Sequence, residues 1–327
     1  MKDLFISDIV TNTPIDSIFI VESPMLKNGG RNKKYINCTL SDRTGKISCR
    51  VWGRSQGGPE EVERVFNILN SNEGMAFHIE GESETYNNEI LVKITDGVGN
   101  LNLPADAGSL SPGDFEYTPY DTKRSRAGIT SCILKIEEPS IRGFVGSVIG
   151  DADGFFDKPA ARKKHHAFRG GLALHTLEVT EIAITASGQM GSVKFDTDIL
   201  IAGAILHDIG KCKSFDPKGF GFSANASYSL LGHITLAIGM TERYRDLVDE
   251  SVYEQILHII QSHHGPYGEI KPQTIEAWTV HFADNMSATI HEVSDDISKI
   301  GPGDTGWGEN VGGPVFRPGI NKKPEYL

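Results

Sequence analysis

The stretch Ala204-Ile205-Leu206-His207-Asp208-Ile209-Gly210-Lys211 decides the fold of this chain. It closes a short and almost wholly apolar segment that begins at Asp198. A segment of this length and apolarity, followed by a glycine, predicts a buried helix that ends at the His207-Asp208 dyad. The dyad would therefore lie in the interior of a helical domain, where two ionisable side chains need a chemical reason to be present.

More imidazoles and carboxylates lie on both sides of this dyad. Each candidate follows the previous one by 21 to 32 residues, which is about one helix plus one loop. Side chains from separate helices can converge in the core of a bundle, which is how helical folds build metal sites. The residues expected to join the dyad there are His175, His233, His263, His264 and Asp284.

The donor types indicate which metals and which chemistry this set would support. Neutral imidazoles and carboxylates suit Mn, Fe, Co, Ni or Zn better than Mg, which prefers oxygen ligands and water. An aspartate next to a ligating histidine can bridge two ions about 3.5–4 Å apart, and such a pair can hold a hydroxide and neutralise a phosphoryl group. A single His-Asp dipeptide would be weak evidence, but the whole set predicts a metal-dependent phosphohydrolase.

Lys211 and the other histidines allow more than one interpretation. As a cation at a helix end, Lys211 could simply face the helix dipole. Its place beside the predicted metals favours a second role, in which it holds a substrate phosphate. Four further histidines are interpreted as hydrogen-bonded structural residues, namely His78, His258, His281 and His291.

The first hundred residues have the periodicity of strands rather than of helices. The alternating runs 35–40 and 46–52 flank a Ser-Asp-Arg-Thr-Gly turn and predict a hairpin. Three strands, a helix and two strands are the element order of a five-stranded Greek-key barrel, the OB-fold. The predicted ranges are strands 16–21, 35–40 and 46–52, a helix over 59–70, and strands 75–81 and 90–95.

The fold class is therefore multidomain, with an OB-fold barrel over 1–100 and an all-α domain over 123–300. Residues 101–122 are a linker, because they contain three prolines and no basic side chain. The later helices are expected over 230–244, 252–263 and 275–297. The segment 301–327 is rich in glycine and proline and shows no periodicity, so we expect an irregular tail.

Composition limits the class of protein. A chain of 327 residues suits two domains. It has no apolar run of eighteen residues and no signal-peptide pattern, so membrane insertion and secretion are not expected. The four scattered cysteines, Cys38, Cys49, Cys132 and Cys212, are expected to be reduced, as in a cytoplasmic protein.

The net charge of −11 argues against a nucleic-acid partner, but the charge is unevenly distributed. A basic strip within 27–34 contains no acid, and a local strip matters more for phosphate contact than the whole-chain sum. These side chains could also be solvated loop charges, and Trp52 could be a core residue. An OB groove binds bases on aromatic faces beside a basic rim, and the candidates here are Lys27, Arg31, Lys33, Lys34, Arg50, Trp52 and Arg54.

Longer strings of sequence carry a resemblance to a known family. The order of the histidines and aspartates is similar to that of the HD-domain metal-dependent phosphohydrolase superfamily. Over about residues 5 to 295 the chain resembles the YhaM-type 3′→5′ exoribonucleases, which place an OB-fold before an HD domain. The strings are Gly170-Gly171-Leu172 with His175-Thr176, Leu206 to Lys211, Leu231-Gly232-His233-Ile234, Ser262-His263-His264-Gly265 and Ala283-Asp284-Asn285.

The resemblance implies an enzyme that removes nucleotides from single-stranded 3′ ends with Mn or a similar divalent metal. The main hypothesis is an exonuclease that acts on RNA, with single-stranded DNA as a further candidate substrate. By motif position, His175, His207, Asp208 and Asp284 would be primary ligands of one ion. His233 and His263 would complete a second site, and His264 would either join them or contact substrate. Asp208, Lys211 and His264 are thus the residues expected at the reaction itself, while His165 and His166 could contact phosphate or form a solvated turn.

Two other functions stay open from the sequence. The same ligands would serve a hydrolase of small nucleotides, such as a nucleoside triphosphate or a cyclic dinucleotide, although such a substrate does not need the barrel. The chain could also be a binding module whose helical domain is a relic, but every expected ligand is present. Self-association through the barrel and the tail is open as well.

Overall fold

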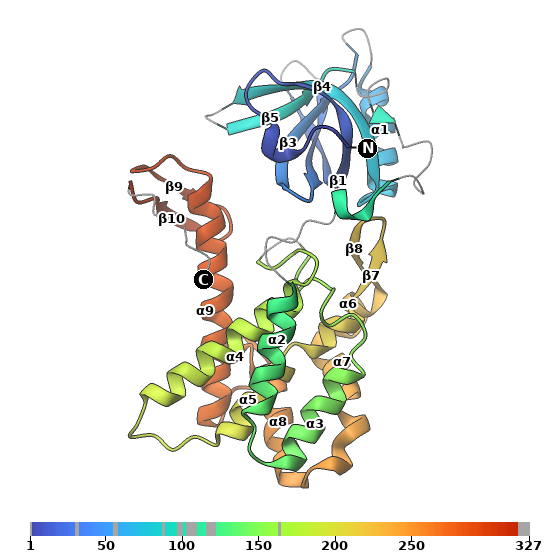
Figure 1. Ribbon diagram of the computed structural model, residues 1–327. Helices are drawn as coiled ribbons and strands as arrows, with labels where there is room; N and C mark the ends of the chain where they lie inside the picture. Colours follow the sequence, from blue (N-terminus) through green and yellow to red (C-terminus); the bar gives the residue numbers. More distant parts are fainter. Residues whose placement is uncertain are drawn as a thin grey trace. The chain divides into compact units, whose positions relative to one another are not determined.

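The computed structural model describes residues 2–29, 33–54, 58–86, 89–96, 101–102, 110–115, 122–162 and 165–319 (Figure 1). The chain divides into two compact units. The first, the barrel unit, comprises residues 1–120 together with 216–223, and the second, the helical unit, comprises 121–215 together with 224–327. Within the described residues no helix has both the length and the apolar character that crossing a bilayer demands.

The barrel unit is a closed five-stranded barrel of the OB type, as predicted. The strands β1 (Pro14–Asn28), β2 (Lys34–Asp42), β3 (Gly45–Trp52), β5 (Glu89–Ile94) and β4 (Ala76–Tyr86) are neighbours in this order, and a β1–β4 pairing closes the ring. The long strand β1 pairs with β4 through its first half and with β2 through its second half. A register shift between Glu22 and Met25 bends it, as a bulge does at a barrel corner. Helix α1 (Pro59–Ser71) lies between β3 and β4 in sequence, and the short β6 (Leu101–Asn102) pairs with β4.

The β2–β3 hairpin shows why the sequence alternates. Ile36, Cys38 and Leu40 point into the barrel core, whereas Tyr35 and the residues two and four positions later face outward. Cys38 lies opposite Cys49, and all four cysteines of the chain are buried and free, as expected for reduced packing residues.

The helical unit is arranged around helix α5 (Thr197–Leu206), in which every residue from Ile199 to Leu206 is buried. Helices α4 (Gly171–Gln189), α8 (Glu250–Ser262) and α9 (Ile275–Ser298) pack against it. The predicted helix 230–244 is shorter than expected, because α7 (Gly232–Thr241) gives way to a 3-10 turn over Glu242–Leu247. The remaining helices are α2 (Thr122–Leu134), α3 (Pro139–Gly150) and the short α6 (Ala226–Leu230).

A small hairpin interrupts the helical sequence and was not predicted. Strands β7 (Phe215–Lys218) and β8 (Gly221–Ala224) form it, and residues 216–223 belong to the barrel unit. Phe220 stacks on the buried Phe115 with ring centroids 4.7 Å apart. Phe115 falls in the predicted linker, so part of that linker belongs to a packed core; residues 103–109 and 116–121 lie outside the described residues.

The expectation of an irregular tail was wrong for its first part. Strands β9 (Thr305–Gly308) and β10 (Gly313–Phe316) form an antiparallel hairpin. The buried carboxylate of Asp296, near the end of α9, accepts hydrogen bonds from the backbone N–H groups of Asn310 (2.9 Å) and Val311 (3.1 Å). Hydrogen bonds between a helix and a later hairpin leave no periodic signal in the sequence. Residues 320–327 lie outside the described part of the chain.

Candidate metal centre

One carboxylate, Asp208, stands between two groups of imidazoles. Its Oδ2 lies 3.5 Å from His175 Nε2 and 3.4 Å from His207 Nε2. Its Oδ1 lies 3.5 Å from His233 Nε2 and 3.8 Å from His263 Nε2. Asp208 is 1% exposed, and Oδ1 is buried without a hydrogen-bond partner. A buried carboxylate oxygen that faces two ring nitrogens without a hydrogen bond suits a bound cation.

The first group comprises His175, His207, Asp208 and Asp284, which come from α4, the end of α5 and α9. Asp284 Oδ1 lies 3.1 Å from His175 Nε2, and the Nε2 atoms of His175 and His207 are 3.4 Å apart. The sequence predicted that these four residues converge, and the fold brings them together.

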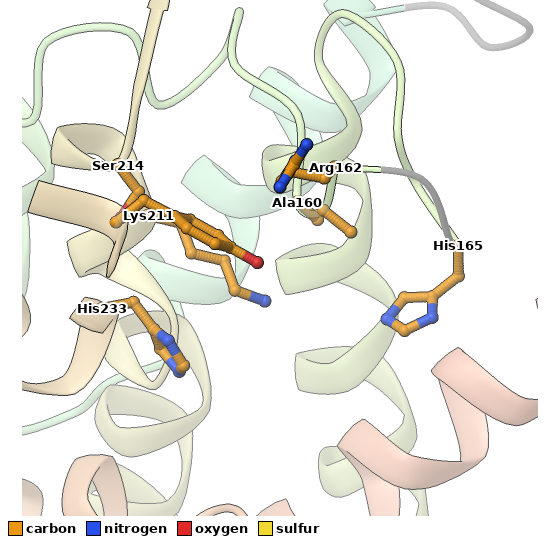
Figure 2. A pocket seen from close by; sticks show the side chains of 8 residues that line it. Ala160, Arg162, His165, Lys211, Ser214 and His233 are labelled. Atoms are coloured by element: carbon orange, nitrogen blue, oxygen red, sulfur yellow. The ribbon is translucent and has the colours of Figure 1, made fainter. Parts of the chain in front are cut away.

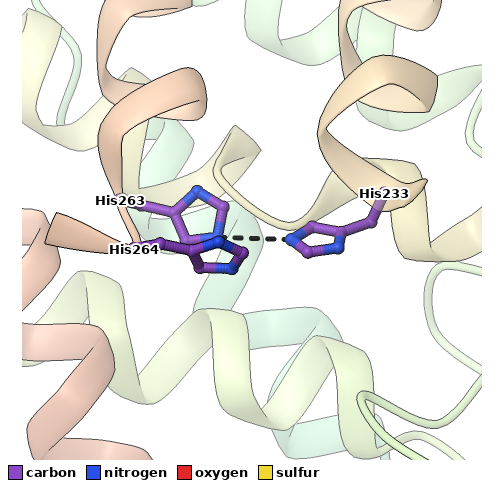
Figure 3. Close-up of side chains that lie close together, drawn as sticks. All are labelled: His233, His263 and His264. Carbon is purple, nitrogen blue, oxygen red and sulfur yellow. Dashed lines mark hydrogen bonds between the residues drawn. The ribbon is translucent and has the colours of Figure 1, made fainter. Parts of the chain in front are cut away.

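The second group comprises His233, His263 and His264, whose ligand atoms all lie within 4.8 Å of one another (Figure 3). His233 starts α7, and His263 and His264 follow α8. The Nε2 atoms of His233 and His263 are 3.4 Å apart. His264 therefore lies with the candidate ligands and is the exposed member of this group, so its two predicted roles, metal ligand or substrate contact, both stay predictions.

The ends of two helices orient two of these rings in the same way. The last carbonyls of a helix lack intrahelical partners. His207 Nδ1 donates to the carbonyl of Ala204, and His263 Nδ1 donates to the carbonyl of Ile260, both at 2.7 Å. Because a carbonyl can only accept, Nδ1 of each ring carries a proton, and when the ring is neutral the lone pair on Nε2 points toward the site.

Burial and neighbouring charges determine the pKa values of the histidines and of Asp208 in this centre. Burial lowers the pKa of His263 to about 3 and that of His233 to about 4, so both rings are neutral at pH 7 and can bind a metal. Burial alone would also lower the pKa of His207, but the charges of Asp208 and Asp284 outweigh it and raise that pKa. Burial alone would raise the pKa of Asp208, but Lys211 and His207 outweigh it and hold that pKa well below its ordinary value.

A pocket of about 680 Å³ opens beside the centre (Figure 2). Arg162, His165, Lys211 and His233 line it, together with Ser214, Tyr228 and two alanines. Lys211 Nζ lies 2.5 Å from Asp208 Oδ2. This lysine, the predicted phosphate-binding side chain, therefore contacts the metal centre and also lines the pocket. His165 lines the pocket and lies 3.2 Å from Glu292, whereas the side chain of His166 is fully buried and faces Glu178. A phosphate contact thus stays a prediction for both histidines, and of the two only His165 lines the pocket.

Two of the histidines interpreted as structural residues bond to the backbone. His258 Nε2 accepts from the N–H of Gln273, and His281 Nδ1 donates to the carbonyl of His263. His78 lies on the barrel, 2.8 Å from Asp16. His291 is different, since it faces Glu178 and His166.

On the barrel, the predicted binding residues differ in what surrounds them. Trp52 stacks on Tyr35 with centroids 4.7 Å apart, and the guanidinium of Arg50 lies 4.0 Å from the ring centre of Tyr86. Lys34 pairs with Glu63, and Arg54 lies 3.0 Å from Asp96, so these two cations have acidic neighbours. Lys27 lies opposite Tyr35 in the β1–β2 ladder, Lys33 is exposed just before β2, and Arg31 lies outside the described residues.

Comparison with known proteins agrees with this geometry. Residues 172–289 match the model of the HD domain family. The helical unit carries an HD domain. Relatives named 3′-5′ exoribonuclease YhaM are similar to most of the chain: that of Geobacillus sp. (strain WCH70) is 27% identical, with 89% of this chain and 87% of the relative covered. The relative of Bacillus subtilis is 26% identical over 89% of this chain and 90% of its own, and that of Shouchella clausii is 27% identical over 96% of both. The resemblance drawn from the motifs is therefore confirmed.

The structure adds residues around the HD domain that the sequence analysis missed. Glu178 lies one turn after His175 on α4, and Ser287 lies one turn after Asp284 on α9. Ser287 Oγ is 3.2 Å from His175 Nδ1 and donates to Glu178 at 2.8 Å. Residues three apart share one helix face, so the spacing of three residues from the candidate ligands His175 and Asp284 was a usable signal. Tyr35 was missed on the barrel, although the hairpin register already placed it opposite Trp52.

Proposed function

We propose that this protein is a metal-dependent 3′→5′ exoribonuclease that hydrolyses phosphodiester bonds of single-stranded RNA. The observation that carries the proposal is Asp208, whose two oxygens face two imidazole groups, of which His233 also lines the pocket. The names of the relatives support the direction of cleavage and the substrate.

The donor set fits a pair of divalent ions of the transition series, and we propose manganese as the working metal. His175, His207, Asp208 and Asp284 would hold one ion, and Asp208 with His233, His263 and His264 would hold the other. Bound there, such ions would lower the pKa of a water molecule and offset the charge of the phosphoryl group.

The chain's own residues bind and orient the substrate. Arg162 and Lys211 present two cations to the pocket, where a backbone phosphate would lie. Lys211 also lies against Asp208, so it can contact the phosphate next to the reacting bond. The volume of about 680 Å³ is in the range of small-molecule sites, about 300–1,000 Å³, and admits one nucleotide at a time rather than a duplex.

The barrel provides a second surface for a polymer. Tyr35 and Trp52 form a stacked aromatic pair on the outward side of β2 and β3, and Arg50 lies beside them. This is the face with which OB-folds bind oligonucleotides. Because stacking does not depend on a 2′-hydroxyl, we also expect some activity on single-stranded DNA. A hydrolase of small nucleotides has no use for this face.

The decisive experiment is a time course on a 5′-labelled single-stranded RNA with Mn²⁺. We expect a ladder that shortens from the 3′ end, that disappears in EDTA and that is lost in Asp208→Ala. The exposed carboxylate variant Asp246→Ala is the matched control and should behave as the wild type. Intact RNA in every lane, together with phosphate release from a panel of nucleotides, would replace this proposal by the small-nucleotide hydrolase.

A further inference from the structure

A second cluster of metal-type donors lies next to His175. It comprises His166, Glu178 and His291, which we call the His166 cluster, and their ligand atoms lie within 4.8 Å of one another. Glu178 Oε2 is 3.1 Å from Nε2 of both His166 and His291. None of the three belongs to the set around Asp208, although the rings of His166 and His175 are only 5.2 Å apart.

His166 is the unusual member of the cluster. Its side chain is completely buried, and neither ring nitrogen has a hydrogen-bond partner, because the nearby Glu178 oxygen is not aligned with an N–H. Leaving a buried imidazole without hydrogen bonds costs free energy, and an ion is one of the few explanations for such a group.

The backbone is built to hold His166 in this position. Its φ angle is +56°, a left-handed conformation that a residue with a Cβ adopts only when the surroundings impose it. Its carbonyl accepts from the N–H of Ala160 and lies so close to Gly171 that a Cβ there would be 2.0 Å away. Gly171 therefore allows the His166 carbonyl to lie against the start of α4.

A hydrogen-bonded chain joins the cluster to the HD centre. With Nε2 of His175 toward Asp208, its Nδ1–H donates to Ser287 Oγ, and the Ser287 hydroxyl donates to Glu178 Oε2. A change of charge at Glu178 would thus reach the orientation and basicity of a ligand in the neighbouring site.

We infer that His166, Glu178 and His291 bind an additional divalent ion of the Zn, Mn or Co type, separate from those at Asp208. Two imidazoles and one carboxylate are a common three-residue set for such ions. Ligands at about 2.0–2.1 Å in a tetrahedral site stand about 3.3 Å apart, and the carboxylate–imidazole separations here are 3.0–3.1 Å. A small outward movement would therefore accommodate the ion, which would give the buried nitrogen of His166 its partner and fix Glu178 for its bond to Ser287.

The test counts ions on the full-length protein, independently of any activity on RNA. The chain is stripped with chelator and reloaded with Zn²⁺ or Co²⁺, and metal per chain is measured by mass spectrometry after dialysis. In a His207→Ala/Asp208→Ala/His263→Ala background, which removes two of the proposed ligands of each ion at the HD centre, we expect one ion per chain to remain. Adding His291→Gln should remove that ion and its Co²⁺ absorption bands.

His291 is half-buried, so its replacement should leave the fold intact, and circular dichroism checks this. Glu178→Gln keeps the shape of the side chain and gives an independent second variant. His258→Gln, a histidine with a backbone contact elsewhere in the domain, is the control and should keep the ion. An ion count that His291→Gln and Glu178→Gln leave unchanged, or an empty protein in the disabled background, would reduce the cluster to an ion pair without metal. If RNA stays intact in the activity assay but these counts hold, the proposed nuclease fails and the metal site stands.

Discussion

At the scale of single residues, function rests on groups whose protonation the fold has fixed. Asp208 is almost fully buried yet stays ionised, because Lys211 and His207 compensate the cost of burial. His263 is equally buried but stays neutral, because burial lowers its pKa to about 3, and its hydrogen bond from Nδ1 leaves Nε2 as the unprotonated nitrogen. The same environment thus prepares an anion and a neutral base side by side, which is the combination a metal cation needs.

His263 should make the stability of the metal-free protein depend on pH. Its pKa is about 3 in the folded state and about 6.5 in an unfolded chain. Between these values the unfolded state binds more protons, so stability falls as the pH is lowered from 6.5 toward 3. His263→Gln should flatten this decline by up to about 1.4 kcal/mol per pH unit.

The measurement is the unfolding midpoint in EDTA at several pH values between 4.5 and 7, for wild type and for His263→Gln. The slope is compared rather than the absolute stability, because glutamine also changes packing. Parallel curves would mean that the pKa of His263 is the same in the folded and unfolded states and that burial does not keep this imidazole neutral at acidic pH.

At the scale of elements, Gly210 of the HD motif allows the turn after the dyad to pack closely against helix α7. Gly210 follows the dyad in the 3-10 turn Ile209–Lys213, which packs against α7. A Cβ at Gly210 would lie 1.9 Å from the carbonyl oxygen of His233 and 2.6 Å from the backbone nitrogen of Ala237. The glycine of the motif therefore sets the distance between Asp208 and His233.

Gly210→Ala should force these two segments apart. We expect a loss of about 1–3 kcal/mol of stability, as for other overpacked sites, together with weaker binding of the metal between Asp208 and His233. Gly239→Ala is the matched control, because Gly239 is exposed in the same helix α7 and a Cβ there meets nothing within 4 Å. That control should be stabilised by up to about 1 kcal/mol.

Denaturant unfolding and Mn²⁺ titration of both variants check this prediction. If Gly210→Ala binds metal as tightly as Gly239→Ala, the distance between the turn and α7 does not control the site.

At the scale of the whole molecule, the two units have separate hydrophobic cores. All candidate ligands lie in the helical unit, so a metal should stabilise that unit alone. An ion at about 1,000 times its dissociation constant contributes about 4 kcal/mol. For a unit of this size we expect its unfolding midpoint to rise by about 10 °C.

Calorimetry with EDTA or Mn²⁺ measures this effect. The transition of the barrel unit should stay in place, and Asp208→Asn should abolish most of the shift of the other transition. A shift of both transitions together would show that the units unfold as one body.

The barrel and the helical unit should cooperate only on long substrates. Stacking on an aromatic side chain contributes about 1–3 kcal/mol per base. Tyr35→Ala and Trp52→Ala should therefore raise KM for long RNA about five- to a hundredfold, with kcat unchanged. Trp307→Ala, an exposed tryptophan of the C-terminal hairpin, is the control and should leave KM unchanged.

Steady-state assays on a long RNA and on a dinucleotide separate the two roles. The dinucleotide should be cleaved equally by all variants. Equal losses on both substrates would mean that the aromatic pair supports the fold of the barrel rather than binding RNA.

Local patterns in the sequence were sufficient for the two architectures and for the set of side chains that converges around Asp208. The alternation of β2 and β3 predicted the barrel hairpin, because the period of a strand is visible in neighbouring residues. The apolar α5 predicted a buried helix that ends at the dyad, because a fully buried helix has no polar face. The spacing by one helix and one loop predicted which residues converge, since each helix can bring one side chain to a bundle core.

Only the tertiary structure decided how these groups are arranged. That the two oxygens of Asp208 face different imidazole groups depends on how α4, α7, α8 and α9 surround the end of α5. The His166 cluster combines a strained loop residue with side chains more than a hundred positions apart, His166 and His291, and no periodicity connects them. The hairpins β7–β8 and β9–β10 depend in the same way on distant partners, Phe115 and Asp296. A sequence records the local preferences of each segment, whereas contacts between distant segments are selected by packing and burial once the chain has folded.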